Sequence, residues 1–121
     1  MAQVRNLPLY SSVYVLVRET YRLKTKLPKS LKHEVGSELF ASAIKILKCV
    51  VLANRSEDKG RFLSRLVLEL EVQWVLHRLL FDLRGISEGE FRVVSERLTE
   101  IGKQSRAWQK WDKSKRPVLK L

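Results

Sequence analysis

FRVVSERLTEIGKQSRAW, residues 91–108, is the stretch that decides the fold. Six residues of this stretch, all apolar except Ser105, recur at alternating steps of three and four positions: Phe91, Val94, Leu98, Ile101, Ser105 and Trp108. We call such a line of residues on one helix face a seam. An α-helix has about 3.6 residues per turn, so this spacing places all six side chains on one face. Such a seam suits antiparallel packing in a four-helix bundle. We therefore predict a helix over about residues 88–111, and Ser87 with Glu90, a capping-box pattern, marks its start.

Two amphipathic helices are predicted nearer the N-terminus. The first, over about residues 7–26, carries apolar and aromatic side chains at three- and four-residue steps: Tyr10, Val13, Tyr14, Val17 and Tyr21. Pro28 ends it, because proline lacks the N–H that a helix interior needs. The second, over about residues 31–54, has a heptad-like seam: Phe40, Ile44, Leu47 and Val51. Gly36 costs about 1 kcal/mol relative to Ala in this helix, so we expect a neighbouring segment to approach it closely.

A third helix, over about residues 57–83, is apolar nearly all the way round. Its main stripe is widened by further apolar residues: Leu68, Val72, Val75, Leu76, Leu79, Leu80 and Leu83. A helix of this kind is buried on more than one side, and so short a chain cannot easily cover it. We interpret the excess as a subunit interface. Ser56 is expected to cap the start of this helix and Gly85 its end.

These segments predict an all-α fold: an antiparallel up-down-up-down four-helix bundle that assembles into a symmetric, ring-like oligomer. The length of 121 residues suits a single domain over residues 1–121. Residues 112–121 are expected to form a frayed basic tail, with Lys113, Lys115, Arg116 and Lys120.

The charge of the chain is strongly positive. It has 24 Lys and Arg against 13 Asp and Glu, a formal net charge of +11, and its pI is about 10.2. So large a charge repels itself, so a polyanion such as nucleic acid or an anionic membrane is the natural partner. A merely soluble basic protein is the alternative. No apolar run approaches the roughly 20 residues of a membrane span, and the N-terminus lacks a signal-peptide layout. We expect a cytoplasmic protein with no membrane partner.

The residue types that catalysis needs do not converge in this sequence. Cys49 is the only cysteine and lies in an apolar run, so we expect a small buried hydrophobe. His77 lies in the apolar third helix, which favours a core or interface position. His33 lies in a basic stretch, which favours a solvated one. We predict that the protein is not an enzyme and has no cofactor or metal site.

Two clusters of basic residues are the informative part of the sequence. The first spans the end of the first helix, the proline turn and the start of the second helix: Arg18, Arg22, Lys24, Lys26, Lys29 and Lys32. The second lies late in the fourth helix and continues into the tail: Lys103, Arg106, Lys110, Lys113, Lys115 and Arg116. Such clusters neutralise phosphates without reading sequence. They need not share an end of the bundle, so they are candidates for two nucleic-acid sites, with a solvated basic face as the alternative.

Further basic residues interrupt apolar helices and complete the candidate nucleic-acid site. Lys45 and Lys48 lie in the second helix and Arg78 in the third. An arginine among leucines must be paired, must snorkel, or must line a polar opening in the ring. The pairing candidates are Glu69, Glu71 and Asp82.

Tryptophans near the second cluster could stack on bases. Trp108 lies on the core seam, so we expect a structural role. Trp111, at the edge of the basic tail, is the better candidate for stacking on a single strand.

Several segments also resemble a known family. They are Leu27-Pro28-Lys29 followed by Val35-Gly36, the run Arg78-Leu79-Leu80-Phe81-Asp82-Leu83, and Glu100-Ile101-Gly102-Lys103 leading to Trp108. From about Tyr14 to Trp111 the chain resembles the accessory variability determinant proteins of diversity-generating retroelements. That family belongs to a four-helix-bundle group that includes proteins encoded in intervening sequences of ribosomal RNA genes.

The resemblance implies a basic, barrel-shaped homopentamer without catalysis of its own. It implies association with the retroelement reverse transcriptase and its template RNA, in support of mutagenic complementary-DNA synthesis. The basic residue that matches the family's motif is Arg78. The resemblance implies a second basic residue about one turn away, which falls near Arg84 here, and His77 is the other candidate for this second position. DNA or an RNA–DNA hybrid is a further possible ligand. Two alternatives stay open: a bundle of the ribosomal RNA intervening-sequence type, and a structural bundle that binds an acidic protein.

Overall fold

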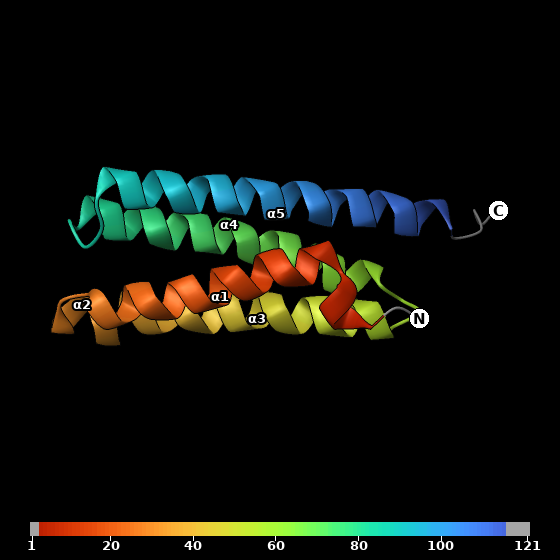
Figure 1. Ribbon diagram of the computed structural model, residues 1–121, viewed down its shortest axis with the longest axis horizontal. Coiled ribbons are helices and arrows are strands. Elements are labelled where there is room, and N and C mark those ends of the chain that lie inside the picture. The colour runs from red at the N-terminus through yellow and green to blue at the C-terminus, as the bar shows by residue number, and fades with distance from the viewer. Residues whose placement is uncertain (1–2, 116–121) are drawn as a thin grey trace.

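Four long amphipathic helices pack side by side in an antiparallel bundle (Figure 1). The computed structural model describes residues 3–115, and within this range every regular element is helical. In chain order the elements are the 3₁₀ helix η1 (Val4–Asn6), α1 (Pro8–Lys26), α2 (Lys29–His33), α3 (Val35–Arg55), α4 (Gly60–Asp82) and α5 (Glu88–Ser114). The predicted all-α four-helix bundle is therefore confirmed.

The core runs along the bundle as two clusters of buried apolar side chains. The larger one joins α1, α3, α4 and α5: Leu9, Val13, Leu16, Ile46, Cys49, Val50, Leu66, Leu70, Val94, Leu98 and Ile101. The smaller one closes the end that carries α2: Leu27, Leu39, Leu80 and Ile86. Burying such side chains contributes roughly 1.5–3 kcal/mol each relative to exposure.

The seam of α5 lies as the sequence predicts. Val94, Leu98, Ile101 and Ser105 are buried, and Phe91 and Trp108 pack half-buried against the core. The capping box is also confirmed. The Glu90 N–H donates to Ser87 Oγ at 3.1 Å, and the Ser87 N–H donates to Glu90 Oε1 at 2.9 Å.

The second predicted helix, residues 31–54, is not continuous. The chain breaks at Glu34, where φ is −97° and ψ is −91°, so the short α2 precedes α3. The break lets α2 lie at the end of the bundle, where Leu31 packs against the smaller core cluster. The close approach expected at Gly36 is confirmed: an added Cβ would lie 3.0 Å from Lys24 Cγ and 3.2 Å from the Leu31 carbonyl oxygen.

The third predicted helix begins later than residue 57, and its predicted cap is wrong. α4 begins at Gly60, and the Ser56 hydroxyl donates to the Asp58 carbonyl at 3.1 Å instead of capping it. Lys59 closes the end of α3: its Nζ donates to the carbonyls of Ala53 and Ser56, both at 2.8 Å. A cation at a helix C-terminus interacts favourably with the helix dipole.

The end of α4 has a Schellman turn whose left-handed residue is Arg84, with φ of 62°, and not the predicted Gly85. The Gly85 N–H donates to the Leu80 carbonyl at 2.7 Å, and the Arg84 N–H to the Phe81 carbonyl at 3.0 Å. This is the bonding pattern of the motif. Gly85 meets a steric demand instead, because an added Cβ would lie 2.9 Å from Leu31 Cδ1.

The predicted basic tail, residues 112–121, starts too early. α5 continues to Ser114, and the side chain of Asp112 is buried with 6% exposure. Its Oδ2 lies near the first residue of α4, 3.9 Å from where a Cβ on Gly60 would stand. A carboxylate near a helix N-terminus interacts favourably with the dipole, and this placement extends α5. Residues 116–121 of the predicted tail lie outside the described range.

One face of α4 leaves a line of large apolar side chains in solvent. They recur at four-, three-, four- and four-residue steps, with exposures between 37% and 58%: Leu68, Val72, Val75, Leu79 and Leu83. Together with Trp74, at 43% exposure, we call this line the α4 seam. The prediction that this helix is apolar beyond its core face is therefore confirmed. Over residues 3–115, none of the helices has the length and apolar character that a membrane crossing requires.

Candidate nucleic-acid interface

The first basic cluster gathers at the end of the bundle that carries α2. α1 ends there, α2 lies there, and the α4–α5 connection returns there (Figure 1). We call this the α2-end surface, defined by Lys24, Lys26, Lys29, Lys32 and Arg84. Lys26, Lys29 and Arg84 are exposed, whereas Lys24 and Lys32 are half-buried. Arg84 joins a surface whose other members lie more than fifty positions earlier in the chain.

Lys24 is committed in part to packing. Its stem lies against Gly36, and its ammonium lies 5.9 Å from the centre of the Phe40 ring. Tyr21 meets the same ring edge-on, with 5.6 Å between the ring centres. A lysine whose stem covers apolar surface still presents its charge to solvent.

The second cluster lies toward the opposite end of the bundle. Lys103, Arg106 and Lys110 are exposed along the C-terminal half of α5, which runs away from α2 (Figure 1). The two clusters therefore form two separate basic surfaces. Lys45 and Lys48 are exposed in the middle of α3, which belongs to neither end.

The two tryptophans near the second cluster differ as the sequence predicts. Trp108 is half-buried against the core, and Lys59 Nζ lies 5.9 Å from the centre of its ring. Trp111 is 49% exposed, and Lys115 Nζ lies 5.7 Å from the centre of its ring. An exposed aromatic ring beside a cation is the arrangement that stacks on a base and binds the adjoining phosphate.

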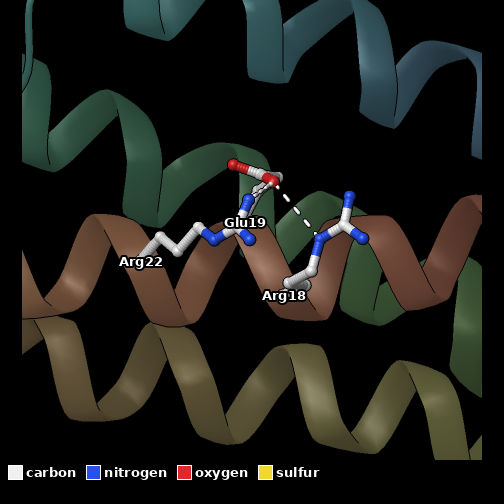
Figure 2. A network of polar contacts seen from close by, with 3 residues as sticks. All are labelled: Arg18, Glu19 and Arg22. Atoms are coloured by element: carbon white, nitrogen blue, oxygen red, sulfur yellow. Dashed lines mark hydrogen bonds and ion pairs between the residues drawn. The ribbon is translucent and has the colours of Figure 1, made fainter.

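Arg18 and Arg22 share one carboxylate on α1 (Figure 2). Arg22 Nη1 donates to Glu19 Oε1 at 2.8 Å, and Arg18 Nε lies 3.4 Å from the same oxygen. A surface ion pair contributes at most about 1 kcal/mol. Each guanidinium keeps further N–H donors, so both can still bind a phosphate. The trio has two positive charges against one negative charge.

Arg78 pairs with Asp82, one of the three partners that the sequence left open. Arg78 Nε lies 3.1 Å from Asp82 Oδ1, and the two side chains are 52% and 53% exposed. Glu69 instead accepts a hydrogen bond from the Ser42 hydroxyl at 2.8 Å. Arg78 therefore stands on the outer surface of the bundle with a neighbouring carboxylate.

The buried positions of His77 and Cys49 and the exposed position of His33 agree with the sequence prediction. Burial lowers the pKa of the His77 imidazole, although its hydrogen bond to the Gln73 carbonyl, at 2.8 Å, acts in the opposite direction. Burial raises the pKa of the Cys49 thiol; the charge of Arg65 opposes this effect and that of Glu69 adds to it. Between residues 3 and 115, no three His, Cys, Asp or Glu side chains gather as metal ligands would.

Sequence reasoning missed a cleft between α1 and α5. It has a volume of about 710 Å³, and Thr20 and His77 line it beside the arginines Arg92 and Arg97 of α5. The signal was present, because Thr20 is a polar residue on the apolar face of α1, four positions after Leu16. That face continues to Leu23, so a threonine there indicates a site at which the core opens.

No family model matches this sequence, and a comparison with curated proteins gives no significant match.

Proposed function

We propose that this protein is a non-catalytic, nucleic-acid-binding accessory subunit. The observation that carries the proposal is the pair of basic surfaces at the two ends of a bundle with a net charge of +11. Phosphates bound on such surfaces release counterions, which gives affinity without reading base sequence. The exposed Trp111 adds a stacking group to the second surface.

The partner that we propose is a retroelement reverse transcriptase with its template RNA. This step rests on the resemblance of residues 14–111 to the accessory variability determinant proteins. In that role the protein holds template RNA, or the RNA–DNA hybrid that forms on it, while the polymerase makes mutagenic complementary DNA. The α2-end surface and the second basic surface, formed by Lys103, Arg106 and Lys110 of α5, lie toward opposite ends of the bundle, so each can serve a different partner.

We further propose that the chain works as a ring of five copies held together by the α4 seam. Five exposed apolar side chains in a line with near-heptad spacing form the kind of surface that packs against another helix. A ring would also repeat Arg78, which flanks the seam, around its axis. The number five rests on the family resemblance alone.

RNA binding is tested by titrating a fluorescent single-stranded RNA and measuring anisotropy at several salt concentrations. We expect saturable binding that weakens as salt rises. The triple variant Lys26→Gln, Lys29→Gln, Lys32→Gln removes three charges of the α2-end surface. If each touches a phosphate, the slope of log affinity against log salt falls by about 2.

The comparison variant removes three other exposed charges toward the opposite end of the bundle, Arg55→Gln, Arg61→Gln and Arg65→Gln, none of which belongs to the α2-end surface. We expect it to weaken binding much less than the first triple variant does. Equal losses in the two triples would show that only net charge matters. A folded protein with no saturable RNA binding at physiological salt would overturn the proposed function.

The ring is tested by native mass spectrometry. We expect a pentamer for the unmodified chain and a smaller species for Val75→Glu, which places a charge at a seam residue that is 57% exposed. Leu52→Glu is the control, because Leu52 is similarly exposed, at 47%, but lies on α3. If the unmodified chain and Val75→Glu are both monomers, or if only Leu52→Glu dissociates the oligomer, the α4 seam is not the assembly interface.

The alternatives give different results in the same experiments. A structural bundle that matches an acidic protein would show no saturable RNA binding while remaining an oligomer. For a protein of the ribosomal RNA intervening-sequence type, the gene would lie within ribosomal RNA sequence. A retroelement partner predicts a reverse transcriptase gene and a pair of near-identical repeats nearby.

A further inference from the structure

α1 and α5 are joined near one end of the bundle and diverge toward the other. Gln104 Nε2 donates to the Ser12 hydroxyl at 3.1 Å and links the two helices near the start of α1. Toward α2 the helices separate (Figure 1), and a cleft of about 710 Å³ lies between them. Its size falls within the range of roughly 300–1,000 Å³ that is typical of small-molecule sites.

The floor of this cleft combines two apolar and two polar side chains. Leu16 of α1 and Val94 of α5 give apolar surface, and Thr20 of α1 and His77 of α4 give the polar atoms. All four side chains have less than a tenth of their surface exposed. Apolar surface with placed polar groups suits a flat, hydrogen-bonding molecule.

The hydroxyl of Thr20 has no partner within residues 3–115. The side chain is 2% exposed, and its Oγ1 is buried without a hydrogen bond. An unsatisfied buried polar group costs about 1–3 kcal/mol, so native structures keep few of them without a reason. The oxygen is closed to solvent, so a ligand group in the cleft would satisfy this hydroxyl, as donor or as acceptor, once the side chain turned toward the cleft.

His77 supplies a hydrogen-bond acceptor of defined tautomer. Its Nδ1 lies 2.8 Å from the Gln73 carbonyl oxygen, which can only accept, so Nδ1 carries the proton. The buried ring is neutral at pH 7 because burial lowers its pKa. Nε2 then carries a lone pair, which suits an N–H donor on a ligand.

The charges at the mouth of the cleft nearly balance. Two arginines of α5, Arg92 and Arg97, line the cleft together with three carboxylates, those of Glu19, Glu90 and Glu96. This mixture does not suit a phosphate inside the cleft. Outside it, Arg18 and Arg22 flank Glu19 and hold two positive charges on the adjoining surface of α1 (Figure 2).

We propose that this cleft binds one uncharged heteroaromatic base, whose polar edge bonds to Thr20 and His77 while its face packs on Leu16 and Val94. Any phosphate attached to the base stays outside, beside Arg18 and Arg22. The base can belong to a free nucleoside or to an unstacked nucleotide of a bound strand. Only the second source rests on the proposed function.

Two probes separate these sources. Adenosine, guanosine, cytidine and uridine are each titrated while NMR follows the amides of Thr20, His77 and Val94. In parallel, a single-stranded RNA that carries one 2-aminopurine is titrated by fluorescence, with the same RNA in a duplex for comparison. We expect a saturable response from at least one nucleoside, from the single strand, or from both.

Two variants assign that response to the cleft. Thr20→Val removes only the hydroxyl and should weaken base binding about fivefold to tenfold. Val93→Trp fills the mouth from a residue that is 51% exposed, so it should abolish the response without disturbing the core. Thr99→Val is the control, because this exposed α5 threonine donates to the Ser95 carbonyl outside the cleft.

The outcomes separate this inference from the proposed function. RNA binding with a 2-aminopurine signal and nucleoside shifts that Val93→Trp leaves unchanged would overturn the cleft and keep the RNA-binding role. Nucleoside shifts that Val93→Trp abolishes, in a protein that binds no RNA, would keep the cleft for a free ligand and overturn the RNA-binding role. Neither nucleoside shifts nor RNA binding would overturn both.

Discussion

Gly85 and Leu31 meet at the α2 end of the bundle so closely that a Cβ on Gly85 would lie 2.9 Å from Leu31 Cδ1. Leu27 and Leu80 stand 3.4 Å from the same point, so Leu31 has little room to retreat. We expect Gly85→Ala to lower the free energy of unfolding by about 1 kcal/mol, which urea denaturation measures. Gly89→Ala is the control: its nearest neighbour is 3.8 Å away, so a gain of about 0.5 kcal/mol is expected. Stabilisation by both changes would show that the leucines yield.

Arg84 has a backbone conformation that favours glycine, with φ of 62°. We expect Arg84→Gly to raise the free energy of unfolding by about 0.5–1 kcal/mol, because glycine has no Cβ to clash there. Arg84→Gln keeps the strain and removes the charge, so it should leave stability nearly unchanged while weakening RNA binding. Thermal denaturation of both variants checks this, and equal stability of the two would contradict it.

Lys59 satisfies carbonyl groups at the end of α3 that would otherwise lack partners. Its Nζ donates at 2.8 Å to Ala53 and Ser56, and the stem stays part-buried. Lys59→Met keeps the stem and removes the donors, so we expect a loss of about 1–2 kcal/mol in urea denaturation. Lys113→Met, at an exposed position of α5, is the control and should stay within about 0.5 kcal/mol.

His77 makes stability depend on pH. Its pKa is lowered in the folded chain by burial, so below the unfolded value of 6.5 the unfolded chain binds a proton that the folded chain does not. Stability is therefore expected to fall as pH drops below 6.5 and to be insensitive to this group above that value. Urea denaturation at several pH values measures the slope. His77→Gln should flatten it and His33→Gln should not; an unchanged slope in His77→Gln would assign it to other groups.

Periodicity predicted the helical stretches but not every stripe that faces the core. α3 buries Leu39, Ala43, Ile46 and Val50, one position before the predicted seam, and Tyr14 and Tyr21 of α1 are exposed. The α5 seam and its capping box needed only residues close in sequence, and both are confirmed. The apolar excess of α4 was equally predictable, because its apolar residues extend beyond the face that packs on the other helices.

The misses at Gly85 and Asp112 depend on contacts between distant segments, whereas the miss at Ser56 depends on a local contact. Ser56 was a reasonable cap by composition, but Lys59 reaches back to α3 and sets the turn. Gly85 was predicted to take the left-handed cap position, but Arg84 takes it. Position 85 needs glycine because the Leu31 side chain packs against it. Asp112 was assigned to the basic tail, but it lies beside the start of α4, and α5 continues through it to Ser114.

The placement of the candidate site also depends on contacts between distant segments, so the sequence predicted only part of it. Both basic clusters were visible as runs of charge, but their placement at opposite ends follows from the helix directions. The sequence did not predict that Thr20 and His77 line one cleft, because they are 57 positions apart in the chain. Only the divergence of α1 from α5 shows that they share a wall.

The order of the helices also has a kinetic consequence. The most extensive packing is between long helices that follow one another along the chain, α1 with α3, α3 with α4 and α4 with α5, whereas α1 with α5 joins distant parts of the chain. Short loops bring such neighbours together at little entropic cost, so this chain belongs with the helical bundles that fold in microseconds to milliseconds. The pairing of α1 with α5 closes the longest loop, and we expect it to be the last to form and the first to open.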